Sequence, residues 1–324
     1  MRAAIQSAYG SPDVLTIQDI EIPVPKDDEV LIRVYATTVN RTDCGILWAK
    51  PFFIRFFTGL FKPRLRVSGT DFAGKIEAVG DSVKQFKVGD RVMGFGGMGL
   101  QSHAEYLTIP ETKVITTIPD DVTYPQAAAC LEGAIYALSA MIFKMNPQAG
   151  QKALVYGATG AIGSAAVQLL KYFGVTVTAV CHTKNLELVK SLGADRLIDY
   201  TSEDFTSDAE RYSFVIDAVG KSSFGQCKPL LLPGGSYVSS DAGPRSENIY
   251  LPLFTAMLGG KKVISPMPRG VKRSVSLIRL LVEQGKFKPV IDREYPLEQI
   301  ADAFRYVATG QKIGNVIITM PFTS

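Results

Sequence analysis

Three glycines spaced by three residues carry the clearest chemistry in the sequence. Gly157, Gly160 and Gly163 follow the apolar run Ala153-Leu-Val-Tyr and open an apolar-periodic run that reaches Lys171. Glycine permits a tight turn, lets the backbone approach a pyrophosphate, and allows the next helix to pack closely. The helix N-terminus adds free N–H groups and a positive dipole end. We therefore predict a nucleotide-binding turn whose contacts come from Gly157, Thr159, Gly160, Ala161, Ile162 and Gly163.

The strand that follows the turn indicates which nucleotide is bound. A branched run, Val175 to Val180, comes where a βαβ unit requires its second strand, which favours nucleotide binding over an ordinary tight turn. NAD sites usually place Asp or Glu at the end of this strand to accept a bond from the ribose 2′-hydroxyl. Here no acid occurs before Glu187, whereas Thr183 and Lys184 could bind a 2′-phosphate. We predict NADPH; a solvated Lys184 near a helix start is the alternative.

The pattern of elements predicts an α/β protein of two domains. Up to residue 122, short branched runs separated by Gly, Pro and Asp are typical of a barrel or rolled sheet. From Thr123, apolar strands alternate with helical patterns, which predicts βαβ units and a doubly wound parallel sheet. The last stretch reads as strand, helix and strand. We expect a β-rich catalytic domain at 1–122, a Rossmann-type NADPH-binding domain at 123–267, and a return to the first domain at 268–324.

Composition restricts the classes of function. Hydrophobic residues make up 46% and charged residues 20% of the 324 residues, as in a folded globular protein. A net charge of +4 with mixed signs argues against nucleic acid as a partner. Four widely spaced cysteines predict no disulfide framework. No signal-peptide pattern and no run of about 20 apolar residues was found, so we expect a soluble cytoplasmic protein.

Several motifs together resemble the zinc-independent quinone oxidoreductase-like branch of the medium-chain dehydrogenase/reductase family, the zeta-crystallin type. They are Gly69-Thr-Asp-Phe-Ala-Gly74, Val88-Gly-Asp-Arg-Val92, the glycine turn, Val189-Lys-Ser-Leu-Gly-Ala-Asp-Arg-Leu-Ile-Asp-Tyr200 and Gly314-Asn-Val-Ile-Ile318. The resemblance implies a GroES-like catalytic domain, a Rossmann-type domain, an NADPH site in the cleft between them, and a homodimer. It implies that Lys184 and Tyr200 flank the 2′-phosphate. We expect further cofactor contacts from Asn40, Val219, Lys312 and Asn315.

The same comparison predicts that no metal is bound. Zinc-dependent relatives place a Cys near Asn40, a His-Glu pair at Thr70-Asp71, and a four-Cys lobe after Val92. This chain has none of these, and neither of its two histidines, His103 and His182, occupies such a position. Asp71 and Glu132 could both approach the cleft, but zinc needs three or four converging ligands.

Without zinc, the family chemistry suits acceptors that are already electrophilic, namely quinones and α,β-unsaturated carbonyl compounds. Tyr136 and Thr42 are our candidate catalytic residues, because a donor must steady the oxygen that gains charge. The alternatives are that Thr42 caps a segment, that Tyr136 packs in a helix, and that Asn40 only orders a turn. Tyr136 replaces a family Thr, and Glu132 adds a carboxylate, so the acceptor is left open.

Two rival functions remain: a zinc-type alcohol dehydrogenase, and a non-catalytic NADPH-binding structural or redox-sensing protein. A segment rich in Phe and basic residues, 48–64, also has two interpretations. We expect it to line an apolar substrate pocket, as the resemblance implies. The alternative is contact with a membrane surface through an amphipathic element.

Overall fold

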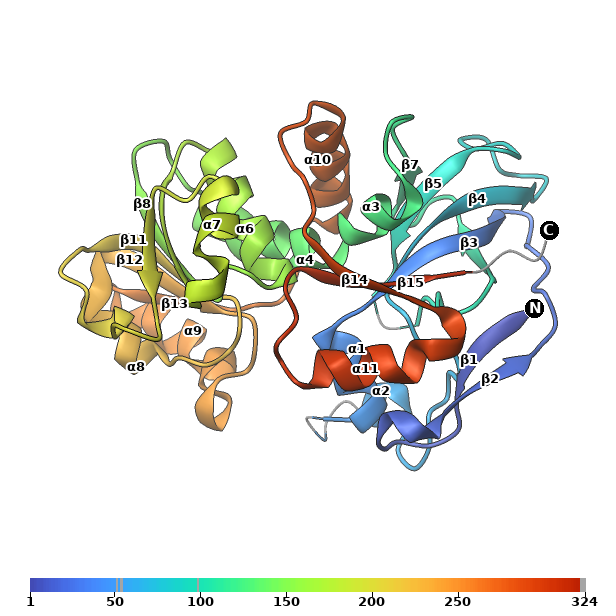
Figure 1. Cartoon of the computed structure of the whole chain (residues 1–324), viewed down its shortest axis with the longest axis horizontal. Helices are drawn as coiled ribbons and strands as arrows, with labels where there is room; N and C mark the ends of the chain where they lie inside the picture. Colours follow the sequence, from blue (N-terminus) through green and yellow to red (C-terminus); the bar gives the residue numbers. More distant parts are fainter. Residues whose placement is uncertain (51, 53–54, 98, 321–324) are drawn as a thin grey trace. The chain divides into compact units, whose positions relative to one another are not determined.

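The computed structural model describes residues 1–50, 52, 55–97 and 99–320. The chain forms two compact units. Unit 1 contains residues 1–132, 275–279 and 289–324, and unit 2 contains residues 133–274 and 280–288. Figure 1 shows the helices and strands of the whole chain, coloured along the sequence.

Unit 1 is built on a seven-stranded sheet with the order β14-β15-β3-β4-β5-β7, in which β6 also pairs with β3. A separate antiparallel pair, β1 and β2, completes its strands. The bounds are β1 Arg2–Gln6, β2 Leu15–Asp19, β3 Glu29–Val39, β4 Asp71–Val79, β5 Arg91–Phe95, β6 Tyr106–Pro110, β7 Ile115–Thr117, β14 Ile291–Pro296 and β15 Asn315–Thr319. The helices are α1 Arg41–Trp48, α2 Arg55–Thr58, α3 Tyr124–Ala129 and α11 Ile300–Ala308.

Strand β3 organises unit 1 because its side chains alternate between core and surface. Val30, Ile32 and Val34 are fully buried and their neighbours are half-buried, as the alternating sequence predicted. Past residue 36 the alternation stops, and Thr37 and Thr38 are fully buried with the apolar residues around them. Buried hydroxyl groups require hydrogen-bond partners, and the neighbouring strand β4 supplies one, as described below.

Unit 2 contains a parallel six-stranded sheet with the order β10-β9-β8-β11-β12-β13, which confirms the predicted doubly wound architecture. The bounds are β8 Lys152–Tyr156, β9 Thr176–Cys181, β10 Arg196–Asp199, β11 Tyr212–Asp217, β12 Leu231–Ser239 and β13 Lys262–Ile264. Its helices include α5 Phe143–Met145, α6 Ala161–Tyr172, α7 Leu186–Ser191, α8 Phe224–Cys227 and α9 Glu247–Leu258. Two further helices cross the division between the units: α4 Glu132–Ile135 and α10 Val271–Glu283.

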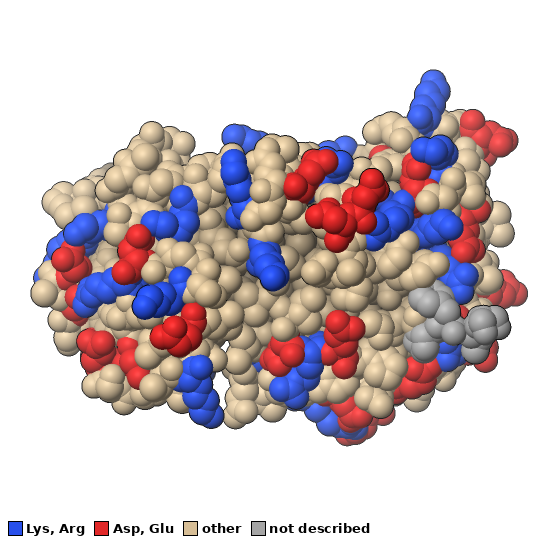
Figure 2. Space-filling model, turned by 45° about the horizontal axis from the view of Figure 1, so that its top comes forward, with Lys and Arg blue, Asp and Glu red and all other residues tan. Residues whose placement is uncertain are grey.

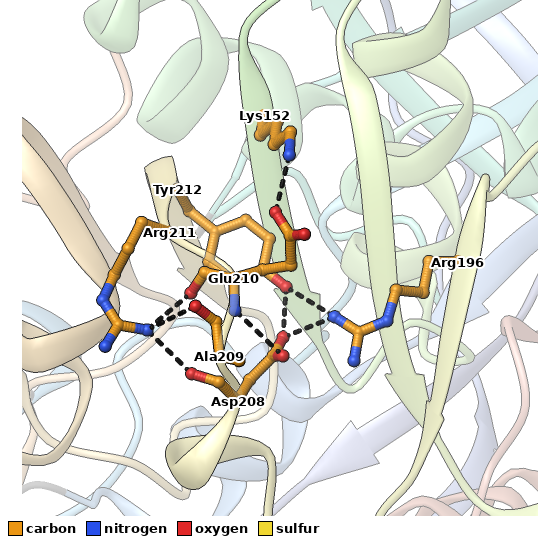
Figure 3. A network of polar contacts seen from close by, with 7 residues as sticks. All are labelled: Lys152, Arg196, Asp208, Ala209, Glu210, Arg211 and Tyr212. Atoms are coloured by element: carbon orange, nitrogen blue, oxygen red, sulfur yellow. Dashed lines mark hydrogen bonds and ion pairs between the residues drawn. The ribbon is translucent and has the colours of Figure 1, made fainter.

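A polar network joins the amino ends of the parallel strands β8, β10 and β11 (Figure 3). Asp208 accepts a bond of 2.7 Å from Arg196 and another from the Tyr212 hydroxyl, and Lys152 donates to Glu210 at 2.6 Å. All three strands begin at this edge. The network therefore fixes the amino edge of the sheet and leaves the opposite, carboxyl edge for ligands.

The chain has a long apolar helical stretch and a surface of mixed charge on the face drawn in Figure 2. The helical stretch Tyr124–Met145 is long and apolar enough to cross a membrane by length and composition, although no such stretch was expected from the sequence. Because 83% of its most apolar window is buried inside the protein, it is weak support for a membrane span. On the face drawn in Figure 2, Lys and Arg are interspersed with Asp and Glu, as the mixed sequence predicted.

Candidate functional site

The glycine turn lies at the carboxyl edge of the sheet in unit 2, between β8 and α6. Gly157 has φ of +78°, a left-handed conformation that favours glycine, and its N–H bonds to the Val180 carbonyl at 3.1 Å. Gly160 is the N-cap of α6, and the Ser164 N–H bonds to its carbonyl at 2.8 Å. The first-turn N–H groups of α6, from Ala161 onward, have no partners within the helix and are free to bind an anion.

The three glycines have different reasons for lacking a side chain. A Cβ at Gly163 would lie 2.1 Å from the Gly157 carbonyl oxygen, and a Cβ at Gly157 would lie 2.4 Å from Val219. At Gly160 the nearest atom would be 3.8 Å away. The fold itself therefore requires glycine at 157 and 163, whereas space is left open at 160. A phosphate approaching the backbone would use that space, so the turn fits the predicted nucleotide.

Asp217 at the end of β11 holds the loop beside the glycine turn. Its buried carboxylate accepts bonds from the N–H groups of Val219 at 3.0 Å, Gly220 at 2.8 Å and Ser222 at 2.7 Å. The Ser222 hydroxyl also donates to it, at 2.7 Å. The predicted cofactor contact Val219 is thereby fixed over Gly157. Sequence reasoning named Val219 but missed Asp217, whose role depends on a loop conformation.

The predicted 2′-phosphate site lies at the ends of β9 and β10. Lys184 is exposed, Tyr200 is about half exposed, and the His182 ring contacts the Tyr200 ring edge-on with centroids 5.7 Å apart. The Thr183 hydroxyl, which we expected to face the phosphate, donates instead to Asp199. That hydrogen bond, together with those from Thr201, lowers the pKa of Asp199.

Asp199 was missed because it belongs to the neighbouring strand. It lies opposite Cys181 in the β9–β10 register. A carboxylate is therefore present at the predicted 2′-phosphate site, although no acid follows directly after Val180 along the chain. A negative charge here opposes a 2′-phosphate, and Lys184 must outweigh it for NADPH to be preferred.

A second group of predicted residues lies in unit 1 and depends on Asp71. Its buried carboxylate accepts bonds from the Thr38 N–H at 2.9 Å, the Thr38 hydroxyl at 2.6 Å and the Thr37 hydroxyl at 3.2 Å. Burial, with the nearby charge of Glu132, raises the pKa of Asp71 to about 7. The opposite face of Thr38 is also fixed, because its carbonyl lies 2.9 Å from Nε2 of the buried His103.

Asn40 and Lys312 extend this network. The Asn40 amide donates to the Thr38 hydroxyl at 2.7 Å, and its oxygen accepts a bond of 3.2 Å from the Lys312 ammonium group. Lys312 also donates to the Gly314 carbonyl at 2.6 Å, and burial lowers its pKa to about 8. Asn40 is the N-cap residue of α1, so it has a structural role together with any cofactor contact.

Glu132 is the second buried carboxyl group of this cluster. It accepts a hydrogen bond from the Thr70 hydroxyl, and the side chains of Thr42 and Asn40 lie close enough to act as further donors. Burial raises the pKa of Glu132, while these hydrogen bonds and the Lys312 charge oppose the shift. The cluster thus brings together Asn40, Thr42 and Lys312, three residues that the sequence predicted separately.

These side chains do not fit a zinc ion. The positions that hold metal ligands in zinc-dependent relatives carry Asn40, Thr70 and Asp71, of which only Asp71 is an anionic ligand. Both oxygens of its carboxylate are already occupied by the Thr37 and Thr38 bonds. Across the described part of the chain, no three His, Cys, Asp or Glu side chains are grouped as a metal site requires.

The remaining predicted residues divide between the units. Asn315, in unit 1, donates to the Val290 carbonyl at 3.0 Å, and its buried side-chain oxygen has no hydrogen-bond partner, so it retains capacity to accept one. Tyr136, in unit 2, is half-buried and begins a π-helical stretch, Tyr136–Ile142. Such stretches occur frequently at functional sites.

The Phe-rich segment contributes partly to a cavity. A cavity of about 360 Å³ in unit 1 is lined by Tyr9, Ile46, Thr58, Arg64, Leu65 and Gly69, among others. By contrast, Phe52, Phe56 and Phe61 are 63%, 65% and 89% exposed. The pocket interpretation therefore describes part of the segment, and its described Phe side chains face solvent. Phe53 lies outside the described residues, as do residues 51 and 54.

The chain is similar to known dehydrogenases and reductases along most of its length. Residues 26–120 match the alcohol dehydrogenase GroES-like domain, and residues 192–318 match a family described as zinc-binding dehydrogenase. The NADPH-dependent alkenal/one oxidoreductase of Arabidopsis thaliana, a chloroplastic protein, is 32% identical over 98% of this chain and 79% of its own length. Human quinone oxidoreductase is 29% identical over 96% and 94%, respectively. The quinone oxidoreductase structure from Coxiella burnetii shares the fold, with a TM-score of 0.86 and 24% identity over 99% of both chains.

Proposed function

Because the chain belongs to the quinone oxidoreductase branch of the medium-chain dehydrogenase/reductase family, we propose that it is a zinc-free, NADPH-dependent oxidoreductase that reduces quinones or α,β-unsaturated carbonyl compounds. The proposal is carried by one combined observation. The glycine turn has open space at Gly160, and, among the described residues, the polar cluster around Asp71 lacks the ligands that a zinc ion needs. NADPH, when bound, supplies the hydride. The protein must hold it, orient the acceptor and provide a proton.

Unit 2 would hold the nucleotide. The backbone of Gly157 to Gly163 and the N-terminus of α6 would bind the pyrophosphate, and Lys184 with Tyr200 would bind the 2′-phosphate. Val219 would contact the cofactor from its position over Gly157. In unit 1, Asn40, Lys312 and Asn315 would make the remaining contacts.

Thr42 and Glu132 would supply the proton. The Thr42 hydroxyl lies close enough to Glu132 to lower the pKa of that carboxyl group. A protonated Glu132 would donate to Thr42, and Thr42 would then pass its own proton to the reduced acceptor. Each turnover would transfer one proton from Thr42 to the acceptor and one from Glu132 to Thr42. Tyr136 remains a second candidate donor.

The acceptor should have an apolar part. The cavity of about 360 Å³ is lined by apolar groups of Ile46, Leu65 and Val67 and by the polar ends of Tyr9 and Arg64. Its wall includes Ser68 and Gly69, which directly precede Thr70 and its bond to Glu132. This arrangement supports an acceptor whose apolar end enters the cavity.

A panel of quinones, enones, aldehydes and simple ketones tests the proposal. NADPH oxidation should be observed with quinones or enones, and the enone product should be saturated at the carbon–carbon double bond. Oxidation of a saturated alcohol that depends on zinc would instead indicate an alcohol dehydrogenase. Tight NADPH binding without turnover of any acceptor would indicate a non-catalytic binding protein.

The oligomeric state and compartment are parts of the same proposal. We favour a homodimer, which is supported by an exposed apolar face on α9, beside the edge strand β13. Its members are Ile249, Tyr250, Leu253, Phe254, Met257 and Leu258. Leu253→Ser with Leu258→Ser should shift the protein to a monomer in sedimentation velocity. We also propose the cytoplasm as the compartment, which localisation of the tagged protein tests. The proposed domain assignment is 1–122, 123–267 and 268–324.

A further inference from the structure

The Phe-rich segment and the two residues after it also form a surface that adjoins the cavity, and Arg64 and Leu65 belong to both. We name the exposed apolar side chains Phe52, Phe56, Leu60, Phe61 and Leu65, with the cations Arg55, Lys62, Arg64 and Arg66, the Phe–Arg surface. It lies in unit 1, before, on and after α2, which Figure 1 draws in light blue at the lower side of that unit. The apolar members are between 43% and 89% exposed.

The structure holds these side chains outward. Phe52 and Phe56 contact each other edge-on with ring centroids 6.3 Å apart, and the Arg55 guanidinium lies 5.4 Å from the Phe52 ring centroid. The Tyr9 hydroxyl fixes the end of α2 to the body of the unit, with contacts of 2.7 Å to both Thr58 and the Gly59 carbonyl. The exposed aromatic rings are therefore presented by an anchored element.

The charge of the surface has one sign. Between Asp43 and Asp71 the chain contains five Lys or Arg residues, Lys50, Arg55, Lys62, Arg64 and Arg66, and no Asp or Glu. One other long stretch lacks acids, residues 248–282 with six Lys or Arg residues. On the face drawn in Figure 2 the two signs are mixed. Exposed aromatic side chains interleaved with cations and without acids are complementary to an interface that is apolar below and negatively charged above.

We propose that the Phe–Arg surface binds the surface of an anionic lipid bilayer, with the Phe side chains entering the headgroup region and the cations contacting lipid phosphates. A second copy of the chain is a poorer occupant, because it would present the same uncompensated positive charge to itself. An apolar pocket of a protein partner would not need the cations. The proposal is independent of the acceptor and of turnover.

Vesicle sedimentation of the full chain tests the proposal. Wild-type protein should bind vesicles of phosphatidylcholine with phosphatidylglycerol, should bind those of phosphatidylcholine alone far more weakly, and should be released by high salt. Lys62→Gln with Arg66→Gln should weaken binding about 25-fold, at about fivefold for each cation lost. Neutralising Lys84 and Lys113, which are exposed elsewhere in unit 1, is the matched control and should leave binding within about twofold.

The apolar contribution is tested separately. Phe52→Ser, Phe56→Ser and Phe61→Ser together should weaken binding roughly 100-fold. The control Val24→Ser, Val88→Ser and Met267→Ser removes side chains that are 85%, 58% and 68% exposed and should have little effect. Thermal unfolding confirms that each variant is folded. Failure of the wild type to bind anionic vesicles, or undiminished binding by the Phe variant, would overturn the proposal. The proposal would also be overturned if the Phe variant changed its sedimentation coefficient and the wild type did not bind vesicles. A second copy of the chain would then cover the surface.

Discussion

Substitution of Lys184 by Ala is the sharpest test of cofactor choice. A 2′-phosphate beside Lys184 should gain one charge-assisted hydrogen bond, worth about 1.5–3 kcal/mol, which corresponds to about 10- to 150-fold in affinity. Lys184 is exposed, and the Asp199 carboxylate shares the same corner, so solvent and the opposing charge reduce the gain. We therefore expect NADPH to bind about 10- to 30-fold more weakly to Lys184→Ala.

Fluorescence titration of both cofactors provides the assay and an internal control. NADH has no 2′-phosphate, so its affinity for Lys184→Ala should match that of the wild type. Lys190→Ala, which removes an exposed Lys from the next helix, should affect neither cofactor. High salt should reproduce part of the Lys184 effect. Equal weakening of NADPH and NADH would show that Lys184 supports the loop, and a wild type that prefers NADH would refute the cofactor assignment.

Three further predictions follow from the two sites. Asp199→Asn removes a negative charge beside the 2′-phosphate and should strengthen NADPH binding about fivefold in the same titration, with NADH unchanged; weaker NADPH binding would contradict this. Gly160→Val should abolish NADPH binding while the unfolding midpoint hardly changes, because a Cβ meets no protein atom nearer than 3.8 Å; unchanged affinity would identify an ordinary turn. Asp71 has a pKa raised to about 7 from an unfolded value near 3.8, so its contribution to stability is complete below pH 4 and is lost as pH rises through 7. Urea unfolding should therefore show a smaller stability difference between pH 5 and pH 8 for Asp71→Asn than for the wild type, and equal differences would oppose this interpretation.

The sequence predicted most of the parallel sheet in unit 2. The runs Ala153–Tyr156 and Val175–Val180 correspond to β8 and β9 within one residue, because each is a short apolar run bounded by glycine or polar residues. Helix α9 was not predicted, since Pro252 lies inside it and interrupts the pattern that indicates a helix. Its exposed apolar face also departs from the usual burial of such a stripe.

The candidate sites were predicted less completely, for a physical reason. The glycine turn is local, so the spacing of Gly157, Gly160 and Gly163 was sufficient to locate it. The bonds from Thr37 and Thr38 to Asp71 depend on the pairing of β3 with β4, which no local pattern specifies.

NADPH oxidation by chelator-dialysed protein tests directly whether the enzyme works without zinc. Purified protein should be dialysed against a strong chelator, its zinc content measured, and its rate with NADPH and a quinone or enone compared before and after. We expect an unchanged rate and no stoichiometric zinc, because Asn40, Thr70 and Asp71 cannot form a zinc site. One zinc per chain, lost together with activity and restored with it, would contradict the account.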